Sequence, residues 1–175
     1  LIFFFLVLVI IIGEFFAQRF LGLGNPMVYE KSILWGYSPA PNQKVKRFRN
    51  SFITIDNVGT RSLNEWHTSD LSKSKLVFFG DSVTFGGSYI DDNDLFSEKV
   101  CQLKTSFKCF NAGVNSYGAL NIIARSRFDT RLEDSNIRIY ILNTGDFFRG
   151  LQDHETAHFI MHDNLGLLPA IYEIL

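Results

Sequence analysis

The chain contains 175 residues, of which 46% are hydrophobic, and its formal net charge is −1. This length and composition suffice for the core of one domain. The 17 basic and 18 acidic residues are interspersed without a long run of one sign, so the sequence argues against a nucleic-acid-binding surface. No repeat or low-complexity tract divides the chain.

The N-terminal segment from Leu1 to Gly13 is uniformly apolar. A membrane-spanning helix needs about 20 residues, and continuation through Ala17 supplies the length. We therefore predict a transmembrane anchor over residues 1–21 and, because the chain opens with Leu, we expect further residues upstream. The alternatives are a buried core helix, which uniform apolarity disfavours, and a cleaved signal peptide, for which no small-x-small cleavage pattern follows.

Residues 22–50 contain three of the four prolines and a cluster of basic side chains. This composition predicts an extended linker that its charges keep in water, with contact to anionic lipid head groups as the alternative. The positive-inside rule would favour a cytoplasmic position, but most of these charges lie too far from the apolar segment to decide the orientation. The basic residues are Lys31, Lys44, Lys46, Arg47 and Arg49.

The remaining residues, 51–175, are predicted to form the folded domain. Alternating residues at 52–56 predict an edge strand that turns at 57–59. Strands that alternate with helices at the observed spacing then imply βαβ units, a parallel sheet and right-handed crossovers. The predicted strands cover 76–79, 107–114 and 137–142, and the predicted helices cover 95–103 and 117–132.

Each predicted helix carries apolar residues on one face. In the first, Phe96, Val100 and Leu103 recur at helical spacing, and the acidic run 91–94 is expected to cap the helix. This run lacks the central glycine and distal glutamate of a calcium-binding loop. The apolar face of the second helix consists of Leu120, Ile123, Ala124, Phe128 and Leu132.

Cysteine and histidine residues suggest no metal site. Cys101 and Cys109 fall on a predicted helix and a predicted strand, so we expect two buried thiols rather than a disulfide. The segment His154–His158 matches the His-Glu-x-x-His pattern of zinc proteases, and His162 follows one turn later. The glycine-spaced third ligand is absent, so we interpret these histidines as polar residues of a surface segment. We predict no metal and no other cofactor.

The segment Lys75–Gly87 holds the clearest chemical signal. An apolar strand stops at Gly80 and delivers Ser82 to a turn at the carboxyl end of the strand, where parallel sheets bind ligands. Gly-Asp-Ser is also ordinary turn chemistry, but in this position Ser82 is a candidate nucleophile, with Gly80 and Asp81 shaping its turn. A nucleotide or flavin binder is another interpretation, although the loop lacks the Lys-Ser/Thr of a P-loop.

Three segments together resemble the first three sequence blocks of the SGNH (GDSL-type) hydrolases. They are the serine turn, Phe107–Gly118 and Ile137–Gly150, and the resemblance covers 57–150. It implies a three-layer α/β/α, flavodoxin-like domain that acts as a serine esterase or acyl transferase on an ester, such as an acyl group on a carbohydrate. Similar membrane-anchored members place this domain outside the cytoplasm.

The resemblance also implies an oxyanion hole. Its donors would be the N–H of Ser82, the N–H of Ser116 where the family has glycine, and a side chain at Gly145 where the family has asparagine. The last donor is therefore missing, although Asn143 or Asn115 could replace it. Loss of such a donor costs about 10²–10³-fold in rate, so a catalytically inactive carbohydrate-binding or assembly module is the alternative.

The general base is the second gap in the family pattern. SGNH hydrolases take it from an Asp-x-x-His near the C-terminus, and this motif does not occur in the sequence. We therefore expect roughly sixty further residues, two βα units of about thirty each, and no esterase turnover from this chain alone. His154 as the base for Ser82 is the alternative. The lead-in Asn57, Gly59 and Arg61 resembles that of anchored members, and Arg61 is interpreted equally as a surface charge or a ligand contact.

Overall fold

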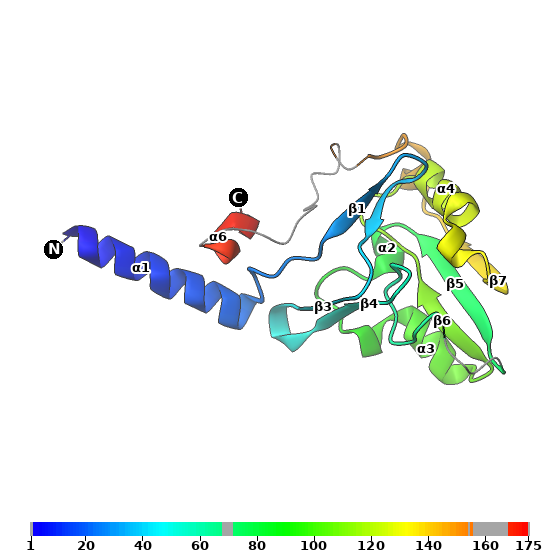
Figure 1. Ribbon diagram of the computed structural model, residues 1–175, viewed down its shortest axis with the longest axis horizontal. Coiled ribbons are helices and arrows are strands. Elements are labelled where there is room, and N and C mark those ends of the chain that lie inside the picture. Colours follow the sequence, from blue (N-terminus) through cyan, green and yellow to red (C-terminus); the bar gives the residue numbers. More distant parts are fainter. Residues whose placement is uncertain (1, 68–71, 154, 156–167, 175) are drawn as a thin grey trace.

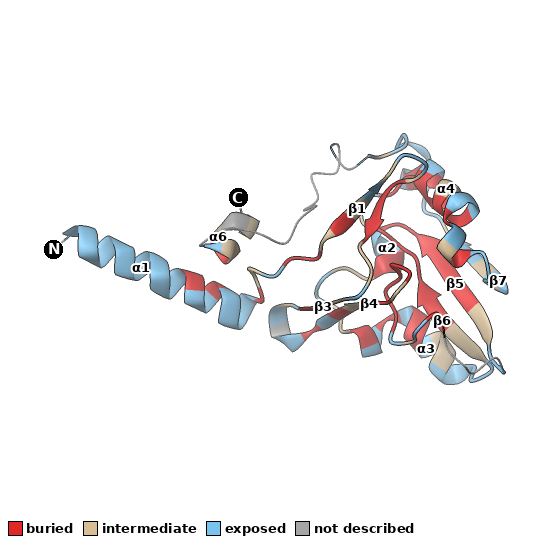
Figure 2. Ribbon diagram, in the orientation of Figure 1, coloured by how far each residue is buried: buried red, intermediate tan, exposed pale blue. Residues whose placement is uncertain are grey.

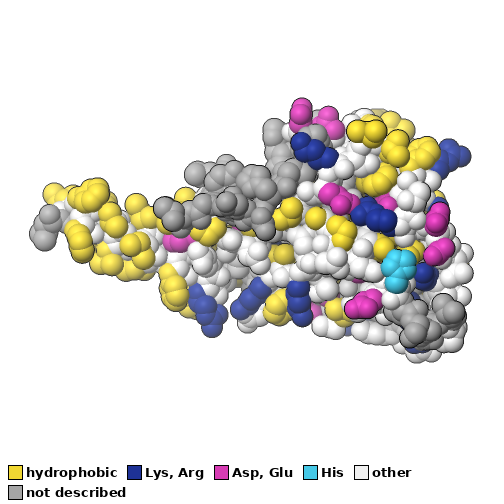
Figure 3. Space-filling model, in the orientation of Figure 1, with side chains coloured by type: hydrophobic (Ala, Val, Ile, Leu, Met, Phe, Trp, Pro, Cys, Tyr) yellow, Lys and Arg dark blue, Asp and Glu magenta, His cyan; other side chains and the backbone are white. Residues whose placement is uncertain are grey.

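The computed structural model describes residues 2–67, 72–153, 155 and 168–174. Helix α1 (Ile2–Phe16) continues into a π-helical turn, Ala17–Leu21. Together they are long and apolar enough to cross a membrane. Figure 1 shows α1 extending away from the rest of the chain, and apolar side chains cover its visible surface (Figure 3). The predicted apolar helix is confirmed.

Residues 22–50 form paired strands rather than an extended linker. Strand β1 (Tyr29–Ser32) pairs antiparallel with β2 (Gly36–Pro39), and β3 (Gln43–Lys46) pairs antiparallel with β4 (Phe52–Ile55). These pairs lie against the domain (Figure 1). The chain between β3 and β4 makes a short 3₁₀ turn, Phe48–Asn50.

This finding corrects the expectation of a solvated linker. Tyr29, Tyr37 and Val45 are buried in the main core cluster, whereas the neighbouring Lys44 and Lys46 are exposed. Lys44 and Lys46 thus occupy outward positions of β3, in which Val45 between them faces the core. The composition of this segment indicated its positive charge, but it did not reveal that exposed basic side chains alternate with a buried apolar one along β3.

A three-stranded parallel sheet forms the centre of the domain. Strand β5 (Ser74–Gly80) lies between β6 (Phe107–Asn111) and β7 (Ile137–Ile141), in the order β6-β5-β7. Helix α3 (Phe96–Leu103) connects β5 to β6, and α4 (Ala119–Phe128) connects β6 to β7. The predicted mixed α/β organisation with a parallel sheet is confirmed.

The two faces of β5 contribute to separate apolar clusters. Val77, which pairs with Phe110 in register, belongs to the larger cluster together with Ile122 of α4. Phe78 belongs to a smaller cluster that includes Val100 of α3. Burial on both faces explains why β5 is continuously apolar, and Figure 2 shows this strand as a buried element.

The buried faces of α3 and α4 differ from the apolar faces that spacing predicted. Leu103 of α3 is exposed, and so are Leu120, Ile123 and Phe128 of α4. The buried side of α4 instead carries Arg125, whose guanidinium donates to the carbonyls of Ala112 (3.2 Å) and Gly59 (2.7 Å). A buried polar side chain is stable in the core when its hydrogen bonds are satisfied. The spacing of apolar residues cannot predict such a side chain.

The acidic run before α3 does not cap that helix. Asp91 caps a separate 3₁₀ turn, Asp92–Asp94, by accepting from the N–H of Asn93. No side chain caps α3 itself. Similarly, α4 ends at Phe128, and Asp129 caps a further 3₁₀ turn, Thr130–Leu132.

A short C-terminal helix lies beside the end of α1. In α6 (Pro169–Ile174), the backbone N–H of Ala170 donates to Glu14 at 2.8 Å. Glu173 of the same helix pairs with Arg47 at 2.5 Å. The buried carboxylate of Glu14 therefore has a helix N-terminus as its partner.

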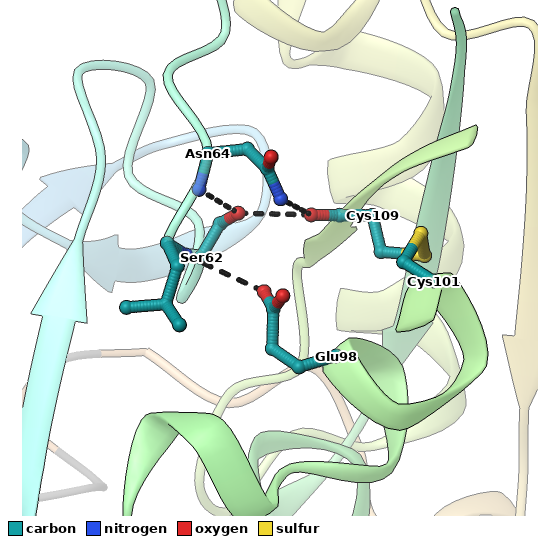
Figure 4. The surroundings of a disulfide bond; sticks show 6 residues. Ser62, Asn64, Glu98, Cys101 and Cys109 are labelled. Carbon is teal, nitrogen blue, oxygen red and sulfur yellow. Dashed lines mark hydrogen bonds between the residues drawn. A yellow bond between two sulfur atoms is a disulfide. The ribbon is translucent and has the colours of Figure 1, made fainter. Parts of the chain in front are cut away.

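Cys101 and Cys109 form a disulfide, which corrects the expectation of two free thiols. Helix α3 lies along β6 and brings the two Cα atoms to 5.8 Å, within the normal range for a disulfide. Around the bond, the hydroxyl of Ser62 donates to the carbonyl of Cys109 at 2.8 Å, and Glu98 accepts from the N–H of Leu63 (Figure 4). The two cysteines lie on different elements, and the sequence does not show that these elements pack against each other.

Replacing both residues, as Cys101→Ala/Cys109→Ala, should lower the free energy of unfolding by about 2–3 kcal/mol, because the bond closes a short loop in the unfolded chain. Urea denaturation of the intact protein in detergent measures the loss. Dithiothreitol should destabilise the wild type by a similar amount and leave the double variant unchanged. If the wild type unfolded at the same urea concentration with and without dithiothreitol, this result would contradict the disulfide.

Candidate active site

The candidate site lies where the chain reverses its direction across the sheet. From β5 the chain crosses to β6 on one side and then returns to β7 on the other. The carboxyl ends of β5 and β7 therefore flank a topological switch point, where α/β sheets bind ligands. Asp81 and Ser82 follow β5, and Asn143 follows soon after β7.

The serine turn is built around a glycine that no other residue can replace without displacement. A Cβ on Gly80 would lie 1.8 Å from Oγ1 of Thr84 and 2.8 Å from the carbonyl of Ile141. Asp81 then caps the single turn α2 (Ser82–Phe85), its Oδ1 accepting from the N–H of Val83 at 2.9 Å. Ser82 itself is exposed. The turn thus leaves Ser82 accessible to solvent at the strand end.

Asn143 bridges the ends of β5 and β7. Its Nδ2 donates to Oδ2 of Asp81 at 2.8 Å, and its Oδ1 accepts from the N–H of Gly145 at 2.9 Å. Its own N–H donates to Asp146 at 3.0 Å, within the 3₁₀ turn Thr144–Phe147. The oxygen and one N–H of this amide are therefore committed to holding the two strand ends together.

Two buried carboxylates and one arginine make up the charged part of the site. Nη1 of Arg149 lies 3.5 Å from Oδ1 of Asp146 and 3.6 Å from Oδ2 of Asp81. Burial raises the pKa of Asp146, and the neighbouring Asp81 carboxylate raises it further, while Arg149 opposes both effects. Arg149 offsets two like charges that would otherwise repel each other.

The loop after β6 supplies the second candidate oxyanion donor. Ser116 adopts a left-handed backbone with φ of 65°, a conformation that glycine adopts more readily. The hydroxyl of Tyr37 donates to the carbonyl of Asn115 at 2.8 Å and so fixes the peptide that carries the Ser116 N–H. In the described part of the chain, neither this N–H nor that of Ser82 has a hydrogen-bond acceptor.

Arg61 is neither a surface charge nor a ligand contact. Its side chain is fully buried, and its Nε donates to Asp92 at 2.8 Å. The rest of the guanidinium donates to backbone carbonyls, which include that of Phe85 at the end of the serine turn and that of Gly87 just after it. The lead-in motif therefore supports the site without entering it.

The predicted histidines could not be placed, since His154, His158 and His162 lie outside the described residues. The described histidine, His67, is exposed. Within the described ranges, no group of three His, Cys, Asp or Glu residues could hold a metal ion.

Sequence reasoning assigned no role to Tyr37, Asp146 or Arg149. Asp146 and Arg149 had a detectable signal, since both lie in the loop that follows a predicted strand at the same edge of the sheet as Ser82. Tyr37 had none, because it reaches Asn115 across 78 residues of sequence.

No protein-family model matches the chain, and no curated protein matches it significantly. The arrangement of residues at the candidate site is therefore the basis for proposing a function.

The raised pKa of Asp146 predicts a pH dependence of stability. A carboxyl whose pKa is raised on folding stabilises the fold in its neutral form, and that contribution is lost as pH rises through the folded pKa. Asp146→Asn should therefore unfold at a higher temperature than the wild type at neutral pH, with the difference shrinking towards about pH 4. The exposed Asp134→Asn should show no such trend. A difference independent of pH would contradict the assignment.

Proposed function

We propose that this chain belongs to a membrane-anchored serine esterase or acyl transferase of the SGNH type, acting on an ester such as an acyl group on a carbohydrate. The observation that carries the proposal is the exposed Ser82 at the carboxyl end of the central strand, beside the switch point between β5 and β7. A small-molecule or glycan ester would bind at this edge of the sheet.

The proposed reaction begins with attack of the Ser82 hydroxyl oxygen on the acyl carbonyl. The N–H groups of Ser82 and Ser116 support it because both lack an acceptor in the described part of the chain, and such donors stabilise a developing oxyanion. A histidine base must take the proton of the hydroxyl. His154 is the candidate within this chain, and an Asp-x-x-His is the usual source in the family that the sequence resembles.

The proposed fold is the three-layer α/β/α, flavodoxin-like domain. Support comes from the two apolar clusters, which join α4 to one face of β5 and α3 to the other. Right-handed crossovers in opposite directions put successive helices on opposite faces of a parallel sheet.

A catalytically inactive carbohydrate-binding or assembly module is the second candidate. Gly145 favours it, because the expected side-chain donor is absent there, and Asn143 is already committed to Asp81 and Gly145. Such a module would bind a glycan at the same edge of the sheet without forming a covalent intermediate on Ser82.

The proposed location is a single-pass membrane protein with the domain outside the cytoplasm. Helix α1 with its π-turn provides the span. The Cys101–Cys109 disulfide supports the proposed orientation, because disulfides persist in oxidising compartments and are rare in the cytosol.

The esterase proposal predicts that a fluorophosphonate probe labels Ser82 in the intact protein. Ser82→Ala should reduce labelling to background, whereas Ser88→Ala, a change of an exposed serine in the same loop, should leave it unchanged. Peptide mapping by mass spectrometry identifies the modified residue. Equal labelling of wild type and Ser82→Ala would sink the esterase proposal, and folded protein that takes up no label would favour the binding module.

The proposed orientation predicts which side of the membrane the domain occupies. A cysteine introduced as Glu133→Cys, at an exposed turn distant from the disulfide, should react with a membrane-impermeant maleimide in intact cells or, in a double-membrane organism, in cells with a permeabilised outer membrane. A cytoplasmic control protein should react only after lysis. Reaction of Glu133→Cys only after lysis would reverse the orientation.

A further inference from the structure

The guanidinium of Arg149 is held from one side only. Its Nη1 donates to the carbonyl of Tyr117 at 2.9 Å and also lies against Asp146 and Asp81. Its Nη2 makes no hydrogen bond with any described residue, and the side chain is 41% exposed. One end of a planar group is therefore fixed while two N–H donors at the other end remain available.

The available end of Arg149 lies close to the position of the missing donor. A Cβ added to Gly145 would lie 4.0 Å from Nη2 of Arg149, and the nearest atom to it would be Oδ1 of Asn143 at 3.1 Å. The amide of an asparagine at residue 145 would thus occupy the neighbourhood that the guanidinium now reaches. The absence of a side chain at Gly145 leaves that space open.

The other candidate donors are engaged in part. Asn143 is committed to Asp81 and Gly145. The side chain of Asn115 interacts with Tyr29, a tyrosine of the buried core, and lowers the pKa that burial raises there. Arg149 differs from both asparagines because its donor is cationic and both N–H bonds of Nη2 lack an acceptor among the described residues.

We propose that Arg149 is the side-chain donor of the oxyanion hole, in place of an asparagine at residue 145. This inference rests on the proposed esterase or transferase function and extends it to a catalytic residue. As the Ser82 oxygen bonds to the acyl carbon, the carbonyl π electrons move to oxygen, and the hydroxyl proton passes to the histidine base. Nη2 of Arg149 donates a hydrogen bond to that oxyanion without losing its own proton.

Two physical features suit Arg149 to this role. A hydrogen bond from a cationic donor to an anion is roughly twice as strong as a neutral one, so a guanidinium can replace an amide. The contacts of Nη1 with Tyr117 and the two carboxylates hold the group in place before the oxyanion forms. A donor that is already oriented costs no reorganisation during the reaction.

The test is a double-mutant cycle on the full-length protein in detergent, with p-nitrophenyl acetate as substrate. Arg149→Lys keeps a cation that can reach Asp146 but removes Nη2, so it should lower kcat by about 10²–10³-fold with little change in KM. Adding Gly145→Asn to Arg149→Lys should restore at least about tenfold, whereas Gly145→Asn alone should change kcat by less than about threefold. The matched control, the exposed Arg127→Lys, should retain wild-type kcat.

Each other outcome overturns the assignment in a recognisable way. Equal gains from Gly145→Asn in both backgrounds would show that Arg149 does not fill the donor position, and unchanged kcat in Arg149→Lys would show that its Nη2 is not used. A large gain from Gly145→Asn alone would also refute the inference, even if Arg149→Lys failed to fold. Turnover that persists in Ser82→Ala would instead reject the proposed function itself, and this inference with it.

Discussion

The buried guanidinium of Arg61 is the constraint on which the arrangement of the site depends. A buried charge without partners would cost several kcal/mol, so each of its donors must find an acceptor. Asp92 and backbone carbonyls provide them, from Phe52 in β4 and from Phe85 and Gly87 after the serine turn. The backbone of Arg61 also bonds Asn111 at the end of β6. One residue thereby joins the N-terminal strands, the serine turn and the parallel sheet.

The N-terminal strand pairs extend this support to the second loop of the site. Tyr37 of β2 holds the carbonyl of Asn115, and the hydroxyl of Tyr117 donates back to the carbonyl of Tyr37. The two rings also meet edge to face, with centroids 5.3 Å apart. A segment that follows the apolar helix directly is therefore part of the framework that orients the Ser116 N–H, so folded structure connects this helix to the candidate site.

Sequence predicted the features that depend on neighbouring residues. The apolar run of β5, its stop at Gly80 and the alternation of strands and helices were all local patterns, and the parallel sheet followed from them. The features that it missed depend on distant contacts. Arg61 is buried because carbonyls from three segments surround it, and Cys101 meets Cys109 because α3 lies on β6. The roles of Gly80, Asp81 and Ser82 in the turn could be inferred, whereas the commitment of Asn143 to Asp81 required coordinates.

The polar framework at the switch point also bears on the choice between enzyme and binding module. Asp81 and Asp146 can lie together only because Asn143 and Arg149 supply donors between them, and this arrangement would serve the shape of either kind of site. A binding module, however, would have no use for the oxyanion donor that we propose at Arg149. Gly145 leaves open the space next to Nη2 of Arg149. Under this proposal, the substitution that first suggests a lost activity also makes room for a different donor. The glycine is then a change of donor rather than the loss of one.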